Sequence, residues 1–360
     1  MNYNDNFSNS KDGECIPVFN QFNVPIFQNK VYPTEAEAQK APIVNVELVQ
    51  SLRSGFIFNK TFNPDVMNYD IHYQNEQANS PFFQNHLQEV LKLLLSFGIK
   101  DKKVVEIGCG KGVFFDIMLE NQIDCIGFDP TYEGDNPRIV KEYFSEIYND
   151  INAEVIIMRH TLEHIPNPFS FIHTIAKANN YQGYLFVEVP TFDWIDEKNA
   201  FWDIFYEHCN YFTKSSLGAM FEEAIVESFF GGQYIYLWAD LAKLRTEIPQ
   251  IVIHKRNNLN FDRQIEKYKT LLAENPSIAI WGAGAKGSTF LNLLDSEKKH
   301  VQYVIDINPL KQEKYIAHTG HPICSPDILT QKPVETIIVM NENYWDEIKG
   351  RVGNIKMYKL

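Results

Sequence analysis

The sequence predicts an α/β protein with a doubly wound, mainly parallel sheet, a small N-terminal domain before it and a second α/β domain after it. Apolar runs of strand length alternate with helical patterns between residues 103 and 189, which is typical of parallel sheets. A glycine-rich turn at residues 108–112 follows the first of these runs, and Asp129 ends the next one. A strand followed by a glycine turn occurs again at residues 277–287, which indicates the second α/β domain.

Length and composition limit the classes of protein to consider. The 360 residues are enough for two or three domains. The net charge of −13, with no long basic run, argues against nucleic acid and anionic membranes as partners. No apolar stretch approaches the roughly 18 residues that a membrane helix needs, and the Asn- and Ser-rich start does not resemble a signal segment. We therefore expect a cytoplasmic protein. The five cysteines form no C-x-x-C pair, which fits reduced thiols.

Punctuation by glycine, proline and polar residues divides the chain into five parts. We expect a disordered tail at residues 1–14, followed by a loop-rich N-terminal domain at residues 15–81. A central domain at residues 82–257, a connector helix at residues 258–275 and a C-terminal domain at residues 276–360 complete the chain. A helix is expected from Pro81 to Gly98. The strands expected in the central domain are 103–107, 123–128, 154–158, 184–189, 225–230, 234–239 and 250–254. Those expected in the C-terminal domain are 277–281, 301–305 and 336–340.

The turn at residues 108–112 predicts a site for a nucleoside cofactor. Glycine at alternate positions allows a tight bend and lets a ligand approach where a Cβ would collide. Asp129 lies seventeen residues beyond Gly112, where a carboxylate can accept hydrogen bonds from a ribose diol. Cys109 inside this turn is read as a small residue that fills a tight space, not as a nucleophile.

The loop after the strand 154–158 is expected to face the cofactor, because ligands bind at the carboxyl ends of parallel strands. His160 or Thr161 would contact an adenine there. Glu163 and His164 are expected to begin the next helix, with His164 either buried or functional. A Glu-His pair suggests a metal, but no third ligand follows at helical spacing, so we predict no metal site.

The segment 201–212 is rich in aromatic rings and carries the pair Glu207-His208. Histidine titrates near neutral pH, and a neighbouring carboxylate can support its charged form. Such a pair can act as a general base that takes a proton from a weakly acidic carbon or hydroxyl. Upstream, Tyr69 and Tyr73 are candidates for a lid that contacts substrate or cofactor, with packing as the alternative.

The C-terminal turn at residues 281–287 has the G-x-G-x-x-G pattern of dinucleotide folds, and Asp306 ends the following strand. Only one mononucleotide half follows, so a phosphate or nucleotide at the helix start is favoured over NAD.

With these pieces the chain resembles the three-domain, S-adenosylmethionine-dependent C-methyltransferases of deoxysugar biosynthesis. Those enzymes methylate a carbon next to the ketone of a nucleotide-linked 4-keto-6-deoxysugar. The resemblance rests on VVEIGCGKG, GFDP, RHTLEHIPNP, EVP, YEHCNYF, WGAGAKG and IDINPLKQEKYIAHTGHPI, which are spread over most of residues 55–345. The first two are common to class I methyltransferases, whereas the Glu-His segment and the last two are more specific. The resemblance implies a class I, Rossmann-like methyltransferase domain and a C-terminal Rossmann-like domain.

The resemblance also implies roles for individual residues. S-adenosylmethionine would be held by the glycine turn and its neighbours, namely Glu106, Gly108, Gly110, Gly112, Asp129, Pro130, Arg159 and His160. His208 would be the base that forms an enolate, and Glu207 would support it, with Tyr206 and Tyr73 as further catalytic candidates. The nucleotide-linked sugar would contact Tyr69, Tyr211, Gly284 and Lys286. We expect a monomer or weak homo-oligomer.

Two departures from the family pattern stand out. The family carries N-terminal zinc-binding C-x-x-C pairs, and this chain has Ser51 to Gly55 at one such place and only Cys15 upstream, so the zinc ligands are expected to be lost. The family also has a tyrosine two residues before the glutamate, where this chain has Phe205. This departure suggests a different substrate or a different methylated atom.

Alternatives remain open at this point. The same fold could methylate oxygen, nitrogen or a non-sugar carbon of a small metabolite. The turn at residues 281–287 could serve an NAD-dependent oxidoreductase. A binding subunit without activity is a further alternative, against which the retained Glu207-His208 pair argues.

Overall fold

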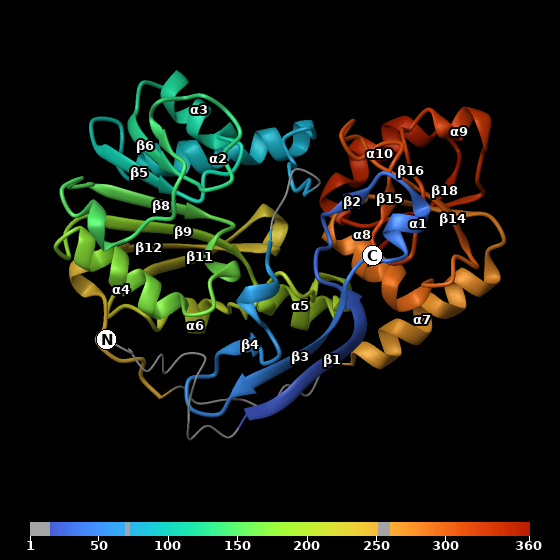
Figure 1. Ribbon diagram of the computed structural model, residues 1–360, viewed down its shortest axis with the longest axis horizontal. Coiled ribbons are helices and arrows are strands. Elements are labelled where there is room, and N and C mark those ends of the chain that lie inside the picture. The colour runs from blue at the N-terminus through green and yellow to red at the C-terminus, as the bar shows by residue number, and fades with distance from the viewer. Residues whose placement is uncertain (1–14, 69–72, 251–259) are drawn as a thin grey trace.

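The computed structural model describes residues 15–68, 73–250 and 260–360. The expected tail 1–14, Tyr69 and most of the expected strand 250–254 lie outside these ranges. Within them the chain forms a four-stranded, a seven-stranded and a five-stranded sheet, which lie side by side in Figure 1. The predicted α/β class is confirmed.

The seven-stranded sheet forms the centre of the fold. Its strands, in spatial order, are β11 (Ile225–Phe229), β12 (Tyr234–Asp240), β9 (Tyr184–Pro190), β8 (Val155–Arg159), β5 (Lys103–Ile107), β6 (Asp124–Phe128) and β7 (Ile139–Val140). The pairs β11–β12 and β12–β9 are antiparallel and the others are parallel. Six of the expected central strands thus occur within one residue at each end, and β7 was not expected.

Helices cover both faces of this sheet, as a doubly wound fold requires. Figure 1 shows α2 (Pro81–Ser96) and α3 (Val113–Glu120) on one side, and α4 (Pro168–Ala178) and α6 (Lys214–Gly218) on the other. Successive side chains of β5 point to opposite faces: Val104 packs with α2 and α3, and Val105 packs with α4. No helix within the described ranges is both long and apolar enough to cross the hydrocarbon core of a membrane.

The helix α2 begins where the sequence predicts. Ser80 caps it by accepting a hydrogen bond from the amide of Phe83, and Pro81 occupies the first helical position. Glu163 and His164, in contrast, do not begin a helix. They lie in a single 3₁₀ turn. α4 starts only at Pro168, because Pro166 interrupts the intervening segment and Pro168 itself suits the first helical position.

The N-terminal domain is an antiparallel sheet completed by a distant segment. Its strands are β1 (Cys15–Pro25), β3 (Ile43–Ser51), β4 (Ile57–Asn59) and β10 (Asn210–Tyr211). β10 comes from the segment just after His208 and pairs with Ile57 and Phe58 of β4. The N-terminal domain therefore holds one end of the segment that carries the candidate base.

The C-terminal domain is a parallel sheet of five strands. In spatial order these are β16 (Ile323–Cys324), β14 (Val301–Ile305), β13 (Ile278–Trp281), β17 (Thr336–Val339) and β18 (Lys356–Lys359). The remaining helices are α1 (Glu35–Ala38), α5 (Phe192–Lys198), α7 (Phe261–Glu274), α8 (Ala285–Leu294), α9 (Ile328–Gln331) and α10 (Trp345–Val352). The 3₁₀ turns are η1 (Pro64–Val66), η2 (Glu146–Tyr148), η3 (Leu162–His164), η4 (Phe201–Asp203), η5 (Phe230–Gly232), η6 (Leu241–Lys243) and η7 (Glu342–Tyr344).

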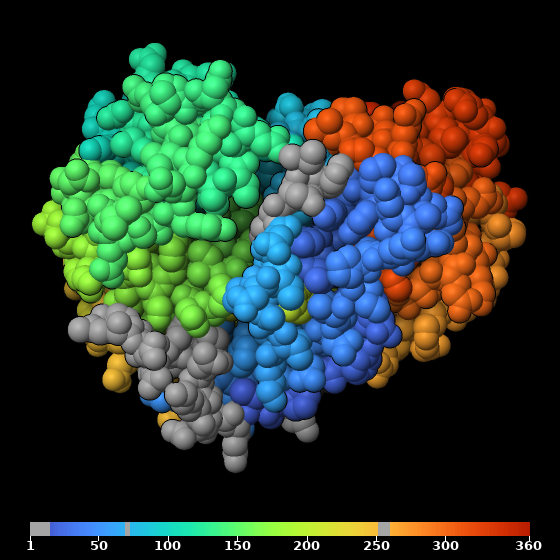
Figure 2. Space-filling model, viewed as in Figure 1, coloured from blue at the N-terminus to red at the C-terminus, as the bar shows by residue number. Residues whose placement is uncertain are grey.

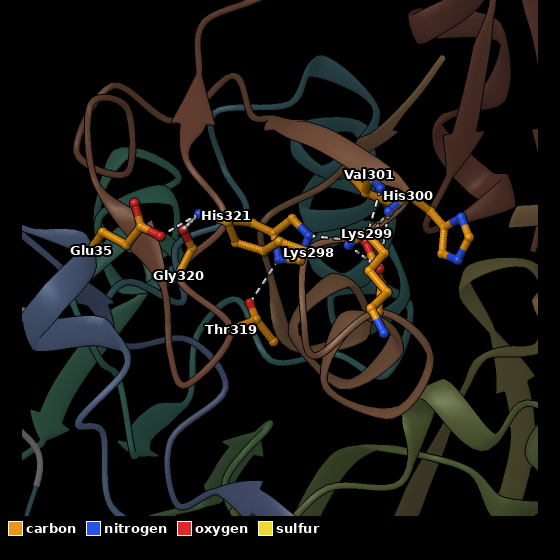
Figure 3. A network of polar contacts seen from close by, with 9 residues as sticks. Glu35, Lys298, Lys299, His300, Val301, Thr319, Gly320 and His321 are labelled. Carbon is orange, nitrogen blue, oxygen red and sulfur yellow. Dashed lines mark hydrogen bonds and ion pairs between the residues drawn. The ribbon is translucent and has the colours of Figure 1, made fainter. Parts of the chain in front are cut away.

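Two contacts tie the N-terminal domain to the C-terminal domain. β2 (Val31–Tyr32) pairs antiparallel with β15 (Tyr315–Ile316). The Lys298 ammonium binds the Glu35 carboxylate at 2.5 Å and donates to the Gly320 carbonyl, as Figure 3 shows. Beside this pair, the buried His321 ring contacts Thr319 and the Asp295 carboxylate, which stiffens the same corner. The N-terminal domain is thereby fixed over the other two.

Candidate active site

A cavity of about 380 Å³ lies between the central and C-terminal sheets. It is lined by the glycine turn of the central domain, the glycine turn of the C-terminal domain and the segment 73–80. The N-terminal domain covers the junction between the two larger domains on the face seen in Figure 2. Residues from all three domains therefore meet at one site.

The glycine turn at residues 108–112 has the conformation that its composition predicts. Gly108, Gly110 and Gly112 all have positive φ, at +77°, +56° and +83°. Gly108 and Gly110 line the cavity, and a Cβ at Gly110 would meet nothing within 4 Å, so open space faces this backbone. Gly112 instead caps α3 and does not line the cavity.

Asp129 holds the glycine turn from behind. Its Oδ2 accepts a hydrogen bond from the Gly110 amide at 2.8 Å, and its Oδ1 accepts from the Thr131 amide and hydroxyl. Neither Asp129 nor Pro130 lines the cavity. A carboxylate offers about four lone-pair positions, so one remains for a ribose hydroxyl.

Two buried groups of opposite type, Glu106 and Arg159, line the cavity beside this turn. Burial raises the pKa of Glu106 to about 7, although the Arg159 guanidinium opposes this effect. One oxygen of Glu106 and one terminal nitrogen of Arg159 are buried with no hydrogen-bond partner among the described residues. The site thus offers a free acceptor and a free donor next to each other.

Arg159 and His160 belong to a buried ionic cluster around Glu188. The Arg159 Nε lies 2.7 Å from one Glu188 oxygen, and the His86 Nε2 lies 2.5 Å from the other. His160 adopts φ +50°, which is uncommon outside glycine, and its ring meets Tyr234 edge-on at 4.5 Å between centroids. His160 lines the cavity, where the sequence predicted an adenine contact.

His208 lines the cavity with its ring free of hydrogen bonds to the described residues. The ring packs against Phe205 at 4.1 Å and against His164 at 4.9 Å between centroids. Burial, together with the nearby His164, His160 and Lys286, holds the pKa of His208 well below its usual range. His208 is therefore a neutral imidazole with an available lone pair, as a general base requires.

Glu207 points away from His208 and towards the N-terminal domain. Its Oε2 accepts a hydrogen bond from the Gln28 amide at 3.2 Å, and it also binds the Tyr73 hydroxyl. Burial raises the pKa of Glu207 to about 8, against the opposing effects of Gln28, Tyr73 and Lys311. No hydrogen bond joins Glu207 to the His208 ring among the described residues, because consecutive side chains diverge here. Glu207 is thus placed to position the segment.

The hydroxyl groups of two candidate tyrosines form hydrogen bonds outside the cavity. The Tyr206 hydroxyl accepts a hydrogen bond from the Asn63 amide at 2.8 Å and donates to the Thr61 carbonyl. The Tyr211 hydroxyl bonds the amide and the carbonyl of Phe205 at 2.9 Å each. Neither lines the cavity, so neither expected contact with substrate is present, whereas Tyr73 does line it. The local sequence cannot show which tyrosine faces the cavity, because the direction of each hydroxyl group depends on packing against the N-terminal sheet.

Gly284 and Lys286 also line the cavity, opposite the central domain. Lys286 pairs with Asp203 at 2.7 Å and lies over the Trp194 ring. Sequence reasoning missed Lys311, a buried cavity residue whose ammonium donates to the Ala283 carbonyl at 3.2 Å. The only signal for Lys311 was its place within the stretch IDINPLKQEK.

The raised pKa of Glu207 makes a prediction about stability. The folded protein keeps a proton on Glu207 up to about pH 8, whereas the unfolded chain releases it near its ordinary value. Unfolding therefore releases a proton in this window, and stability falls as the pH rises from about 5 to about 8. Because glutamine stays neutral, we expect Glu207→Gln to gain stability relative to the wild type by up to about 1.4 kcal/mol per pH unit.

Urea unfolding of both proteins at four pH values from 5.5 to 8.5 (roughly one unit apart) would measure this difference. Glu106 contributes a slope of the same sign to both proteins, so only the difference isolates Glu207. Glu89→Gln on the exposed side of α2 is the control and should show no such trend. A difference that stays constant across the range would contradict a protonated Glu207.

The chain is similar to known methyltransferases in both of its larger domains. A model of a methyltransferase domain matches residues 68–224, and a model of the C-methyltransferase C-terminal domain matches residues 253–357. The C-methyltransferase NovU of Streptomyces niveus is 23% identical over 77% of this chain and 76% of its own length. A ubiquinone biosynthesis O-methyltransferase of Aliivibrio fischeri is 31% identical over 25% of this chain and 44% of its own length.

A solved S-adenosylmethionine-dependent methyltransferase from Aquifex aeolicus aligns with 45% of this chain and 94% of its own, at 17% identity and a TM-score of 0.35. Both domain matches are to methyltransferases, and so is the similarity to NovU. The chain is therefore an enzyme, an S-adenosylmethionine-dependent methyltransferase. The C-terminal match and the similarity to NovU support a C-methyltransferase.

The residues around the glycine turn fit S-adenosylmethionine. Its amino-acid end carries a charge of each sign, and the partnerless atoms of Glu106 and Arg159 offer an acceptor and a donor for it. Gly110 faces open space that can take the rest of the molecule, whereas the Thr161 side chain fills the space beside Gly108. These residues, with Asp129 behind the turn, would hold the cofactor.

Proposed function

We propose that this enzyme methylates a carbon adjacent to the ketone of a nucleotide-linked deoxysugar, with His208 as the base. The observation that carries the proposal is the position of the neutral His208 ring inside the cavity that the two glycine turns share. Among the described residues, this ring has no hydrogen-bond partner. A carbon next to a ketone must lose a proton before it can act as a nucleophile, and a neutral imidazole can take that proton.

When bound, S-adenosylmethionine supplies an electrophilic methyl group. The residues of this chain would do the remaining work. His208 takes the proton and holds it on a ring nitrogen, and Phe205 and His164 fix the plane of the ring by packing against it. Glu207 forms hydrogen bonds with Gln28 and Tyr73 and thereby fixes the segment 201–212 against the N-terminal domain. Tyr73 is the tyrosine proposed to lie beside the sugar.

The C-terminal domain is proposed to hold the nucleotide part of the substrate. The backbone at Gly284 leads into the N-terminus of α8, where amides and the helix dipole favour anions. Lys286, which is paired with Asp203, and the buried Lys311 lie on the same side of the cavity and could reorient towards a phosphate. This part of the proposal assigns the glycine turn of the C-terminal domain to substrate and not to NAD.

Phe205 bears on the choice of substrate. Its ring packs on His208, and it offers no hydroxyl at the position where the sugar enzymes have one. O-methylation of a small metabolite is therefore the second candidate, and the local similarity to an O-methyltransferase favours it over transfer to nitrogen. His208 would serve a hydroxyl in the same way as a carbon acid.

A methyl-transfer assay separates these two candidates. The enzyme would be incubated with S-adenosylmethionine carrying a ¹³C-methyl group and with a panel of nucleotide-linked 4-keto-6-deoxysugars, and the products examined by NMR. We expect a new carbon-bound methyl on at least one sugar. A methyl bound to oxygen would favour the second candidate, and cofactor binding without methylation of any keto-sugar would contradict the proposed substrate class.

The cytoplasmic location, and the expectation of a monomer or weak homo-oligomer without nucleic-acid partners, stay predictions. Size-exclusion chromatography with light scattering would test the oligomeric state.

A further inference from the structure

The structure brings a third potential metal ligand to the Glu163-His164 pair. His208 lies 44 residues after His164, on the segment that leads into β10. One ligand atom from each of the three side chains lies within 4.8 Å of the other two. The local sequence offers two ligands only. The third lies beside them because its neighbours bind the 3₁₀ turn: the Asn210 side-chain amide donates to the Leu162 and Ile165 carbonyls, and the Cys209 thiol donates to the Glu163 carbonyl.

Glu163 and His164 each use one polar atom in a contact with the described residues, namely Glu163 Oε1 with His160 and His164 Nδ1 with Glu207, and each keeps its other atom for a ligand bond. The Glu163 side chain is buried, and its Oε2 makes no hydrogen bond there. The His164 Nδ1 lies 2.9 Å from the Glu207 carbonyl, which can only accept, so Nδ1 carries the proton. The His164 Nε2 therefore presents a lone pair. A hydrogen bond of this kind to the second ring nitrogen is the usual support of a metal-bound histidine.

The surroundings suit a cation with an open coordination position. All three residues line the cavity, so a water or a substrate oxygen could complete the shell. The nearby ammonium of Lys286 is already paired with Asp203.

We propose that Glu163, His164 and His208 bind one divalent transition-metal ion of the zinc class, and that the bound ion blocks methyl transfer. Two histidines and one carboxylate are a common set for zinc with a fourth position open. Ligand atoms around a tetrahedral zinc lie about 3.4 Å apart, so the side chains need to close by at most about 1.4 Å from their present limit of 4.8 Å. The ion accepts a lone pair from each ligand, and no bond breaks. The inhibition of methyl transfer rests on the role of His208 proposed above, whereas the binding of the metal ion does not.

Cobalt(II) is the probe for binding, because its visible absorption reports tetrahedral coordination. The metal-stripped full chain would be titrated with CoCl₂, and bound cobalt counted after dialysis. We expect one ion per chain. His164→Asn keeps a donor for the Glu207 carbonyl but lacks the Nε2 ligand, and Glu163→Gln keeps the shape but lacks the charge. Each should weaken cobalt binding at least about tenfold.

His173→Asn is the matched control, because His173 lies on α4 against Phe169 and outside the cluster. It should bind cobalt as the wild type does. Thermal unfolding without metal checks that each variant is folded. Absence of cobalt binding, or binding that neither His164→Asn nor Glu163→Gln weakens, would overturn the site.

Zinc inhibition of methyl transfer tests the consequence. Activity should fall as one equivalent of ZnCl₂ binds and return when a chelator removes it. Zinc bound at the three residues with activity intact would support the site and contradict the role of His208 as base. This outcome separates a failure of the proposed function from a failure of the metal site.

Discussion

His208→Ala is expected to lower methyl transfer by a factor of about 10² to 10⁴, the usual contribution of a positioned general base. The loss follows from the geometry of the cavity, where the His208 ring is a neutral imidazole that makes no hydrogen bond to a described residue. Binding of S-adenosylmethionine should be retained, because the glycine turn lies on a different strand and loop. Steady-state rates and calorimetric binding of the cofactor would measure the two quantities.

The matched control is His173→Ala, which removes an imidazole from outside the cavity and should leave the rate unchanged. A second measurement isolates the proton transfer: exchange of the substrate's carbon-bound hydrogen with deuterated solvent should be lost in His208→Ala. If His208→Ala keeps the exchange and the rate, another group is the base.

The second large effect is expected from Glu188→Gln, which should destabilise the protein by about 3 to 5 kcal/mol. Glu188 is fully buried and binds both His86 and Arg159. Burial alone would raise its pKa, but the Arg159 guanidinium and His86 hold it well below the usual range. Glutamine has the same shape without the charge, so the guanidinium would stay buried and uncompensated.

Denaturant unfolding at pH 7 would measure this loss, with Glu227→Gln as the control. Glu227 lies on β11 of the same sheet, 64% exposed, and its partner Lys214 is 3.8 Å away. Exposed pairs of this kind contribute about 0 to 1 kcal/mol. Similar effects of the two substitutions would mean that the buried cluster does not depend on the charge of Glu188.

Patterns short in sequence predicted most of the fold. The apolar runs at β5, β8 and β9 are buried on both faces, and such runs indicate central parallel strands without reference to the rest of the chain. The glycine turn after β5 was predicted for the same local reason, because its positive φ values need glycine. The short strands β7 and β16 were missed, because two residues carry no periodicity.

The candidate site was predicted best where a residue acts through its own backbone or lies at a strand end. Gly108 and Gly110 act through the backbone, Arg159 and His160 lie at the end of β8, and all four line the cavity. Tyr206 and Tyr211 were placed in the site because they neighbour His208 in sequence, but their hydroxyl groups bond backbone groups elsewhere. Side-chain direction within an irregular segment depends on what packs around it.

The sequence by itself determined the alternation of strands and helices and the two glycine turns, since each depends on contacts within a few residues. The class of reaction came from the family resemblance of these motifs. The tertiary structure alone decided which distant side chains meet. It placed His208 beside His164, where Cys209 and Asn210 bind carbonyls of residues 162–165, and Lys311 on the Glu207 side of the cavity. Such meetings depend on how three domains pack, and the energy of that packing is spread over apolar surfaces far from the residues brought together.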